Sequence, residues 1–268
     1  MSCARYWTDD LFACLMNILQ RTLIEKTGHE NGFENILPNP DDGVLLGSAR
    51  HRAQAAITLD VDKWLLEVNS AASRLLPSEL VRSFTAIPLQ NDKFVLSTID
   101  ELAKLLRRAA KLAQALPNQA ASDYEAQVQE ELAKLPANTK GTEVERMVRQ
   151  RIGQNAFRNA MLAYWSGACA VTGIAVSEVL RASHAKPWAD CANDAERLDV
   201  FNGFLLSANL DALFDRCLIT FDDTGEIIIS PRLTQDQRDM LGLKPSLCLR
   251  WIANEHLFYL QYHRSLFL

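Results

Sequence analysis

A short stretch in the second half of the sequence constrains the fold of this chain more than any other part. A strand is expected over 179–185, and a polar segment then leads to Asn202-Gly203. Ser207 can cap a helix that carries Asp211 and Asp215 one turn apart. The apolar residues between these aspartates indicate that the helix packs, with its acidic face at the border of the core.

Helices and strands are mixed along the rest of the chain. Apolar spacing and capping residues predict helices over 9–28, 97–116, 122–134, 142–165 and 253–264, and a short one from Thr234. Apolar runs between turn signals predict strands over 44–46, 56–59, 64–68, 84–89, 93–96, 218–221 and 226–229. Residues 29–43 are rich in Asn, Gly, Pro and Asp and predict a loop. The first helix places Leu11, Leu15, Ile18, Leu19 and Leu23 at helical spacing.

This mixture predicts an α+β fold with two domains. A mixed α/β domain is expected over 1–135, followed by helical linking segments and a second domain over 142–268, with its central motif at 169–218. Residues 136–141 are the predicted linker, because Pro, Asn and Gly are concentrated there.

Composition places the chain among globular proteins and excludes several classes. No run approaches the roughly 20 uncharged apolar residues of a membrane span, so no membrane partner is expected. The six cysteines are scattered without a CxxC pair, which favours reduced thiols and a cytoplasmic location over a disulfide framework. The net charge of −5 argues against a general basic coat, but a local basic patch is enough to bind nucleic acid.

The residues around His184 suit metal-assisted cleavage of phosphodiesters. An imidazole is largely neutral near pH 7 and can take a proton from water, while Asp and Asn oxygens suit a hard divalent cation. Each residue also has an ordinary explanation when it is taken alone. His184 would be a core histidine, Asn202-Gly203 a turn, and Asp211 with Asp215 a solvated acidic edge.

Five short motifs follow one another in this region: Cys169-Ala170-Val171-Thr172-Gly173, Leu180-x-Ala182-Ser183-His184-x-Lys186-Pro187-Trp188, Arg197-Leu198-Asp199, Asn202-Gly203-x-Leu205-Leu206 and Leu213-Phe214-Asp215. Their order and spacing, over about residues 150–232, resemble the HNH endonucleases, which have a ββα-metal fold. The resemblance implies that His184 is the general base. It implies that Asn202 either orients the loop or His184, or contacts the metal as well. It implies that Asp211 and Asp215 bind the metal. The nearest candidates for phosphate contacts are Arg181, Lys186 and Arg216, and the alternative for each is a solvated surface charge.

Two positions depart from the family pattern. Ser183 stands where many HNH enzymes have a metal-binding His or Asp, and Asp211 replaces the final His. The resulting oxygen-rich set favours Mg²⁺ or Mn²⁺ over Zn²⁺.

The resemblance implies a metal-dependent endonuclease that acts on DNA, with a recognition or regulatory domain in 1–135 and a role in restriction or phage defence. One such site cuts one strand, so a double-strand break implies a homodimer. The arginines at 146, 149, 151 and 158 form either a solvated helix face or a stripe for the DNA backbone. The alternative is a degenerate HNH scaffold that binds nucleic acid or protein without catalysis, and RNA cleavage is a third hypothesis.

Overall fold

The computed structural model of the chain describes residues 16–39, 43–117, 119–134 and 142–267. These residues form two compact units, one ending at Ala110 and one beginning at Lys111, each described by itself below. The predicted α+β class is confirmed, since an antiparallel sheet with helices is followed by helices and small hairpins. Within the described ranges, no helix has the length and apolar character that crossing a bilayer requires.

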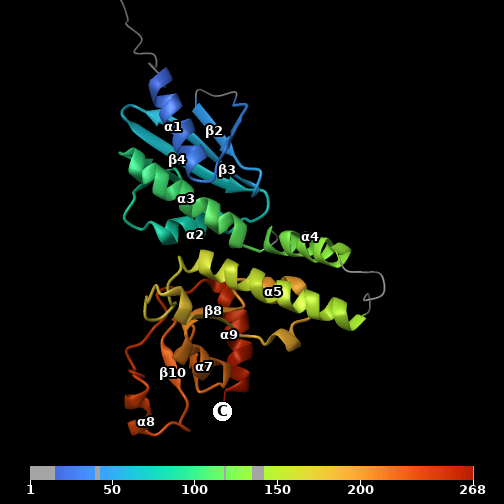
Figure 1. The fold of residues 1–268 in the computed structure, drawn as a ribbon. Helices are drawn as coiled ribbons and strands as arrows, with labels where there is room; N and C mark the ends of the chain where they lie inside the picture. Colours follow the sequence, from blue (N-terminus) through green and yellow to red (C-terminus); the bar gives the residue numbers. More distant parts are fainter. Residues whose placement is uncertain (1–15, 40–42, 118, 135–141, 268) are drawn as a thin grey trace, which may run out of the picture. The chain divides into compact units, whose positions relative to one another are not determined.

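An antiparallel sheet of six strands is the centre of the first unit (Figure 1). Its spatial order is β1-β2-β3-β4-β6-β5. The strands are β1 (Asn35–Leu37), β2 (Gly43–Gly47), β3 (Ala53–Asp60), β4 (Lys63–Ser70), β5 (Leu89–Gln90) and β6 (Lys93–Leu96). Asn91 and Asp92 make the tight turn between the last two, with φ of +50° and +63°. Four of the predicted strands in this region are confirmed as β2, β3, β4 and β6.

Two segments of this unit differ from the prediction. The expected loop over 29–43 contains β1, which pairs with β2 through only three residues and so leaves no apolar run in the sequence. The expected strand over 84–89 is largely absent, because Phe84 ends the helix α2 (Leu76–Ser83) and only Leu89 pairs in the sheet. The helix α2 carries Pro77 in its first turn and was not predicted.

The first helix begins later than expected and buries a different face. α1 (Ile18–Glu30) is capped by Asn17, whose side chain accepts from the Gln20 N–H, while the predicted start at residue 9 lies outside the described residues. The predicted apolar face is wrong, since Ile18 and Leu19 are 86% and 79% exposed. The helix instead packs through Ile24, Thr27 and Gly28. A Cβ on Gly28 would lie 2.5 Å from Leu46 Cδ1, so the missing side chain permits the close approach to β2.

The helix α3 (Ile99–Ala115) is confirmed, with Thr98 as its cap. The second unit starts within it and continues through α4 (Gln119–Lys134) and α5 (Thr142–Tyr164), which lie side by side (Figure 1). The Arg149 guanidinium on α5 bonds Glu125 on α4 at 2.9 Å. The predicted linker at 136–141 lies outside the described residues, so a domain division at 135–142 stays a prediction.

A hairpin and a helix follow α5. β7 (Leu180–His184) pairs antiparallel with β8 (Gly203–Ser207), and α7 (Ala208–Asp215) continues directly from β8. The loop between the strands holds the short helix α6 (Asp194–Leu198). The remaining elements are β9 (Ile219–Phe221), β10 (Ile227–Ile229), α8 (Gln235–Met240) and α9 (Asn254–Leu266). The predicted strand, hairpin and helices of this half are therefore confirmed.

Candidate active site

The pairing of β7 with β8 fixes where His184 lies. His184 is opposite Gly203 at the end of the ladder, and Ser183 is opposite Phe204. A Cβ on Gly203 would lie only 1.9 Å from the Ser183 carbonyl oxygen, and the residue has a φ of +155°. Only glycine fits there without moving the strands apart. Gly203 therefore permits the close strand contact that holds the histidine at the end of the ladder.

One hydrogen bond fixes the tautomer of the His184 imidazole. Its Nε2 lies 2.8 Å from the carbonyl oxygen of Arg197. A carbonyl only accepts hydrogen bonds, so Nε2 carries the proton and donates it. In the neutral ring Nδ1 then holds the lone pair, and no residue of the described ranges forms a hydrogen bond with it.

Burial lowers the pKa of His184, while the hydrogen bond to the Arg197 carbonyl and the charge of Asp215 act in the opposite direction. The imidazole is partly buried and stacks on Phe157 with a centroid distance of 3.7 Å. A histidine with a lowered pKa is neutral at pH 7, which is the form that accepts a proton. The site thus offers a neutral imidazole with a free basic nitrogen.

Asn202 is fully buried and ties the loop between β7 and β8 together. Its Oδ1 accepts from the Lys186 N–H at 2.8 Å, and its Nδ2 donates to the Glu196 carbonyl at 3.0 Å. Asn202 therefore closes the loop that presents the Arg197 carbonyl to His184. In this geometry it is a positioning residue, and it does not line the cleft described below.

Ser183 and the two aspartates of α7 bring oxygen atoms together. The Ser183 hydroxyl is buried and donates to Asp215 Oδ1 at 2.9 Å. Asp211 lies one turn earlier on the same helix. Burial raises the pKa of Asp211, and the neighbouring Asp215 carboxylate raises it further. Two carboxylates that repel each other in this way would both be stabilised by a cation between them.

The oxygen donors fit a hard divalent ion better than a closed zinc site. In the part of the chain that the structure describes, no cluster of three or more His, Cys, Asp or Glu residues could hold a metal. Mg²⁺ is often held by only one or two carboxylates, with water and substrate phosphate as its other ligands. Asp211 and Asp215 supply such a pair, whereas Zn²⁺ usually takes three or four protein ligands.

A cleft with a volume of about 440 Å³ opens beside His184. Asp215 and Arg216 line it at the end of α7, and His263 and Leu266 line it from α9. Arg216 is exposed and makes no ion pair with any described residue. The cleft is therefore the place where a phosphate would meet both the imidazole and a free guanidinium.

The other predicted phosphate-binding residues are engaged elsewhere. The Lys186 ammonium bonds Glu196 at 2.8 Å, and its side chain is 13% exposed. The Arg181 guanidinium bonds the carbonyls of Glu178 and Leu180, each at 2.9 Å, while the residue remains exposed. Arg216 is thus the predicted cation that the geometry leaves most available.

The predicted arginine face of α5 is divided between structural and exposed residues. Arg158 donates to the carbonyls of Leu180 and Ser177 at 2.7 and 3.0 Å, and Arg149 pairs with Glu125. Arg146 and Arg151 are exposed. Two of the four arginines therefore hold α5 against neighbouring segments. The four residues form neither the fully solvated helix face nor the continuous basic stripe that the sequence suggested.

The sequence did not indicate several residues around the imidazole. Phe157 comes from α5, the Arg197 carbonyl from the short helix α6, and His263 from α9. His263 is buried and stacks on Phe214 with a centroid distance of 3.8 Å. No local pattern marks these contacts, because each joins residues that are distant in the sequence or uses a backbone atom.

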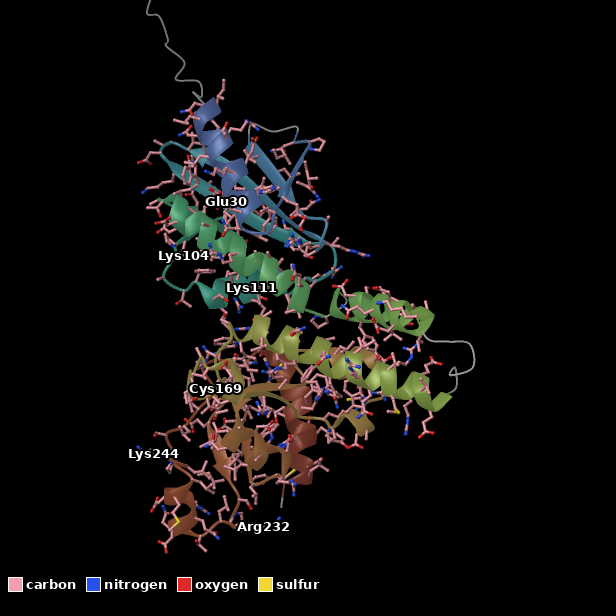
Figure 2. The ribbon with its side chains drawn as sticks, in the orientation of Figure 1. Glu30, Lys104, Lys111, Cys169, Arg232 and Lys244 are labelled. Atoms are coloured by element: carbon pink, nitrogen blue, oxygen red, sulfur yellow. The ribbon has the colours of Figure 1, made fainter. Side chains whose placement is uncertain are left out.

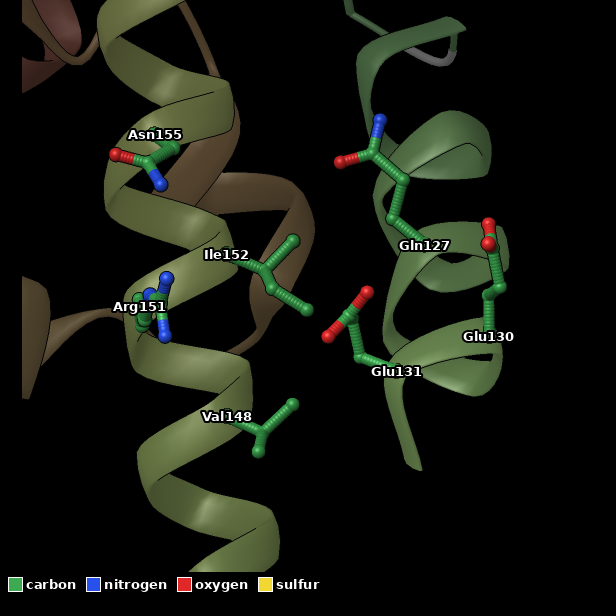
Figure 3. A pocket seen from close by; sticks show the side chains of 7 residues that line it. All are labelled: Gln127, Glu130, Glu131, Val148, Arg151, Ile152 and Asn155. Carbon is green, nitrogen blue, oxygen red and sulfur yellow. The ribbon is translucent and has the colours of Figure 1, made fainter. Parts of the chain in front are cut away.

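A second hollow, of about 290 Å³, lies between α4 and α5 (Figure 3). Val148 and Ile152 point from α5 toward the side of Glu131 on α4. The residues lining it include carboxylates, amides and one arginine but no imidazole or thiol. It offers no proton acceptor comparable with His184.

Comparison with known families agrees with this geometry. Residues 169–222 match the model of a family described as HNH endonuclease, so the chain contains an HNH endonuclease domain there. The matched segment begins at Cys169, which is labelled in Figure 2. Domains of this family act on nucleic acid and typically use a divalent metal ion. A comparison with curated proteins finds no match.

Proposed function

We propose that the HNH endonuclease domain at residues 169–222 makes this chain a metal-dependent nuclease that hydrolyses DNA phosphodiester bonds. One observation carries the proposal. The Arg197 carbonyl fixes the proton on Nε2 of His184, which leaves Nδ1 as a basic nitrogen beside a cleft that Asp215 and Arg216 also line. A general base, an acidic pair and a free cation are the groups that hydrolysis of a phosphodiester needs.

In this mechanism Nδ1 of His184 takes a proton from a water molecule as the water oxygen attacks phosphorus. The bond from phosphorus to one ester oxygen breaks on the opposite side, and that oxygen leaves with the bonding electron pair and takes a proton from solvent water. Arg216 stabilises the negative charge on the phosphate, and Asn202 keeps the loop closed so that the imidazole holds its orientation.

Asp211 and Asp215 would hold a divalent metal ion, Mg²⁺ or Mn²⁺. When bound, such an ion supplies Lewis-acid stabilisation of the charge that develops on the phosphate oxygens. Ser183 orients Asp215 through its hydrogen bond and so acts as an outer support of the pair.

A plasmid-nicking assay tests this proposal. The purified chain is expected to nick plasmid DNA with Mg²⁺ or Mn²⁺ and not with EDTA. His184→Ala should lower the rate by a factor on the order of 10²–10⁴, the usual contribution of a general base. His29→Ala, at an exposed histidine on α1, is the matched control and should cut like the parent. Undiminished cutting by His184→Ala would remove His184 as the base.

The alternative is a non-catalytic module on an HNH scaffold that binds nucleic acid or protein. It is favoured by one observation, the small ligand set, because no group of three metal-binding side chains occurs among the described residues. Absence of cutting on plain DNA, modified DNA and RNA, together with retained binding, would support it.

Finer features of the function rest on the resemblance and on composition alone. They are DNA rather than RNA as substrate, a role in restriction or phage defence, a homodimer for double-strand breaks and a cytoplasmic location. The same assay on RNA addresses the first of them, and the ratio of linear to nicked plasmid addresses the dimer.

A further inference from the structure

We propose that helix α5, which precedes the matched segment, supports the active site by packing against His184, with Phe157 as a positioning residue for the imidazole. The inference rests on the proposed function, since it concerns the same imidazole. It goes further by placing a required part of the site outside the region that carries the family motif.

The contact between the two rings is close and nearly parallel. The centroids of Phe157 and His184 lie 3.7 Å apart with an interplanar angle of 18°. Phe157 is 2% exposed, so its ring is fixed by the core of the second unit and not by solvent. A buried ring on one face of the imidazole limits the planes that the imidazole can adopt.

The same face of α5 supports the neighbouring residues of the site. Gly153, one turn before Phe157, faces Trp188, and a Cβ on it would lie 2.2 Å from that indole. The Trp188 ring in turn meets His184 edge-on with centroids 5.9 Å apart. Arg158 holds the start of β7 through the Leu180 carbonyl at 2.7 Å. α5 therefore contacts the strand β7, which ends in His184, and the rings of His184 and Trp188, which line the cleft.

Two contacts together determine which nitrogen faces the substrate. The Arg197 carbonyl sets the direction of Nε2 in the plane of the ring, and Phe157 sets the plane itself. Without the ring of Phe157 the imidazole can turn about its bond to Cβ, and the hydrogen bond to Arg197 alone has to hold Nδ1 toward the cleft. A fraction of molecules would then present a different edge to the attacking water.

Steady-state cleavage of a short duplex tests the inference. Phe157→Leu should lower kcat about 3- to 10-fold, the ratio expected for the loss of one aromatic pair, with KM changed by less than about twofold. Phe221→Leu is the matched control, because it removes a fully buried ring that packs on Phe204 and Phe214 in the same unit. Phe157→Met, whose unbranched and flexible side chain adapts to irregular gaps in a core, serves if the leucine variant does not fold.

A second measurement does not depend on cutting. The ¹⁵N chemical shifts of the His184 ring report which nitrogen carries the proton, and the parent should show the Nε2–H form alone. Phe157→Leu should give a second ring signal or averaged shifts, whereas Phe221→Leu should match the parent. If the parent cuts no nucleic acid, these shifts alone decide the inference. Parent-like shifts and kcat in Phe157→Leu would overturn it, as would an equal loss of kcat in both variants with unchanged shifts.

Discussion

Substitution of Gly203 by alanine should separate the two strands that present His184. The added Cβ would lie 1.9 Å from the Ser183 carbonyl oxygen and 3.1 Å from His184 Cα, and both atoms belong to the backbone. Neither atom can move aside as a flexible side chain could. The strands must therefore shift at the residue pair that contains the histidine.

The magnitude follows from two costs. Overpacking a well-packed region costs about 1–3 kcal/mol, and a non-glycine residue in a strained backbone conformation costs roughly 1–3 kcal/mol more. The free energy of unfolding should thus fall by about 2–6 kcal/mol. The control is Gly167→Ala, at a φ of +68° with no atom within 4 Å of the added Cβ, which carries the backbone cost alone.

Urea unfolding followed by tryptophan fluorescence measures both variants, with the m-value as a check that the same transition is compared. Gly203→Ala should also lose cleavage activity under conditions where it is folded, because the shift displaces His184 from the Arg197 carbonyl. If Gly203→Ala costs no more than Gly167→Ala, the close contact between β7 and β8 is not what places the histidine, and the reasoning fails.

Three further predictions address protonation, metal and substrate. Because burial lowers the pKa of His51, His184 and His263, the unfolded chain takes up protons that the folded chain does not. The urea concentration at the unfolding midpoint should therefore not change with pH above about pH 6.5, and should fall as the pH is lowered below about 6.5 toward the lowered pKa values of the folded state. A midpoint that rises as the pH is lowered contradicts this prediction. Ser183→Ala should raise the Mn²⁺ concentration for half-maximal cutting by about 10- to 100-fold, because Asp215 loses the hydrogen bond that orients it, and an unchanged value would remove that role. Arg216→Ala should weaken DNA binding and lower by about one the slope of the logarithm of the binding constant against the logarithm of salt concentration. Lys186→Met should instead lower the melting temperature, because it loses the bond to Glu196, and should leave DNA affinity unchanged. Fluorescence anisotropy at several salt concentrations separates these two, and the reverse pattern would exchange their roles.

Local patterns in the sequence predicted most elements of the fold. The strand at His184 and the helix with Asp211 each depend on neighbouring residues, so their signals are contained within a few positions. The buried face of α1 was not predictable in this way. The missing side chain of Gly28 permits one side of that helix to approach the sheet closely. The apolar residues Ile18 and Leu19 lie on a different side, and they led the sequence pattern to predict that this other side is buried.

The sequence predicted those parts of the candidate site that consist of polar side chains, but not its backbone contacts or its aromatic packing. His184 and Asp215 line one cleft, and Asn202 closes the loop behind it. The proton on Nε2 is fixed by a carbonyl group, and every residue has one. The motif Arg197-Leu198-Asp199 marks this segment, but the sequence offers no signal for the role of the Arg197 carbonyl. Phe157 looks like any core aromatic until the fold brings its ring against the imidazole.

The cleft beside His184 has a consequence for the order in which the site is assembled. Its walls include Leu266 on the last helix, together with residues from β7 and α7 made much earlier in synthesis. A chain that has been synthesised through α7 but not through α9 has the histidine and both aspartates but lacks the α9 wall of the cleft. The site is therefore complete only after α9 has been made and has docked.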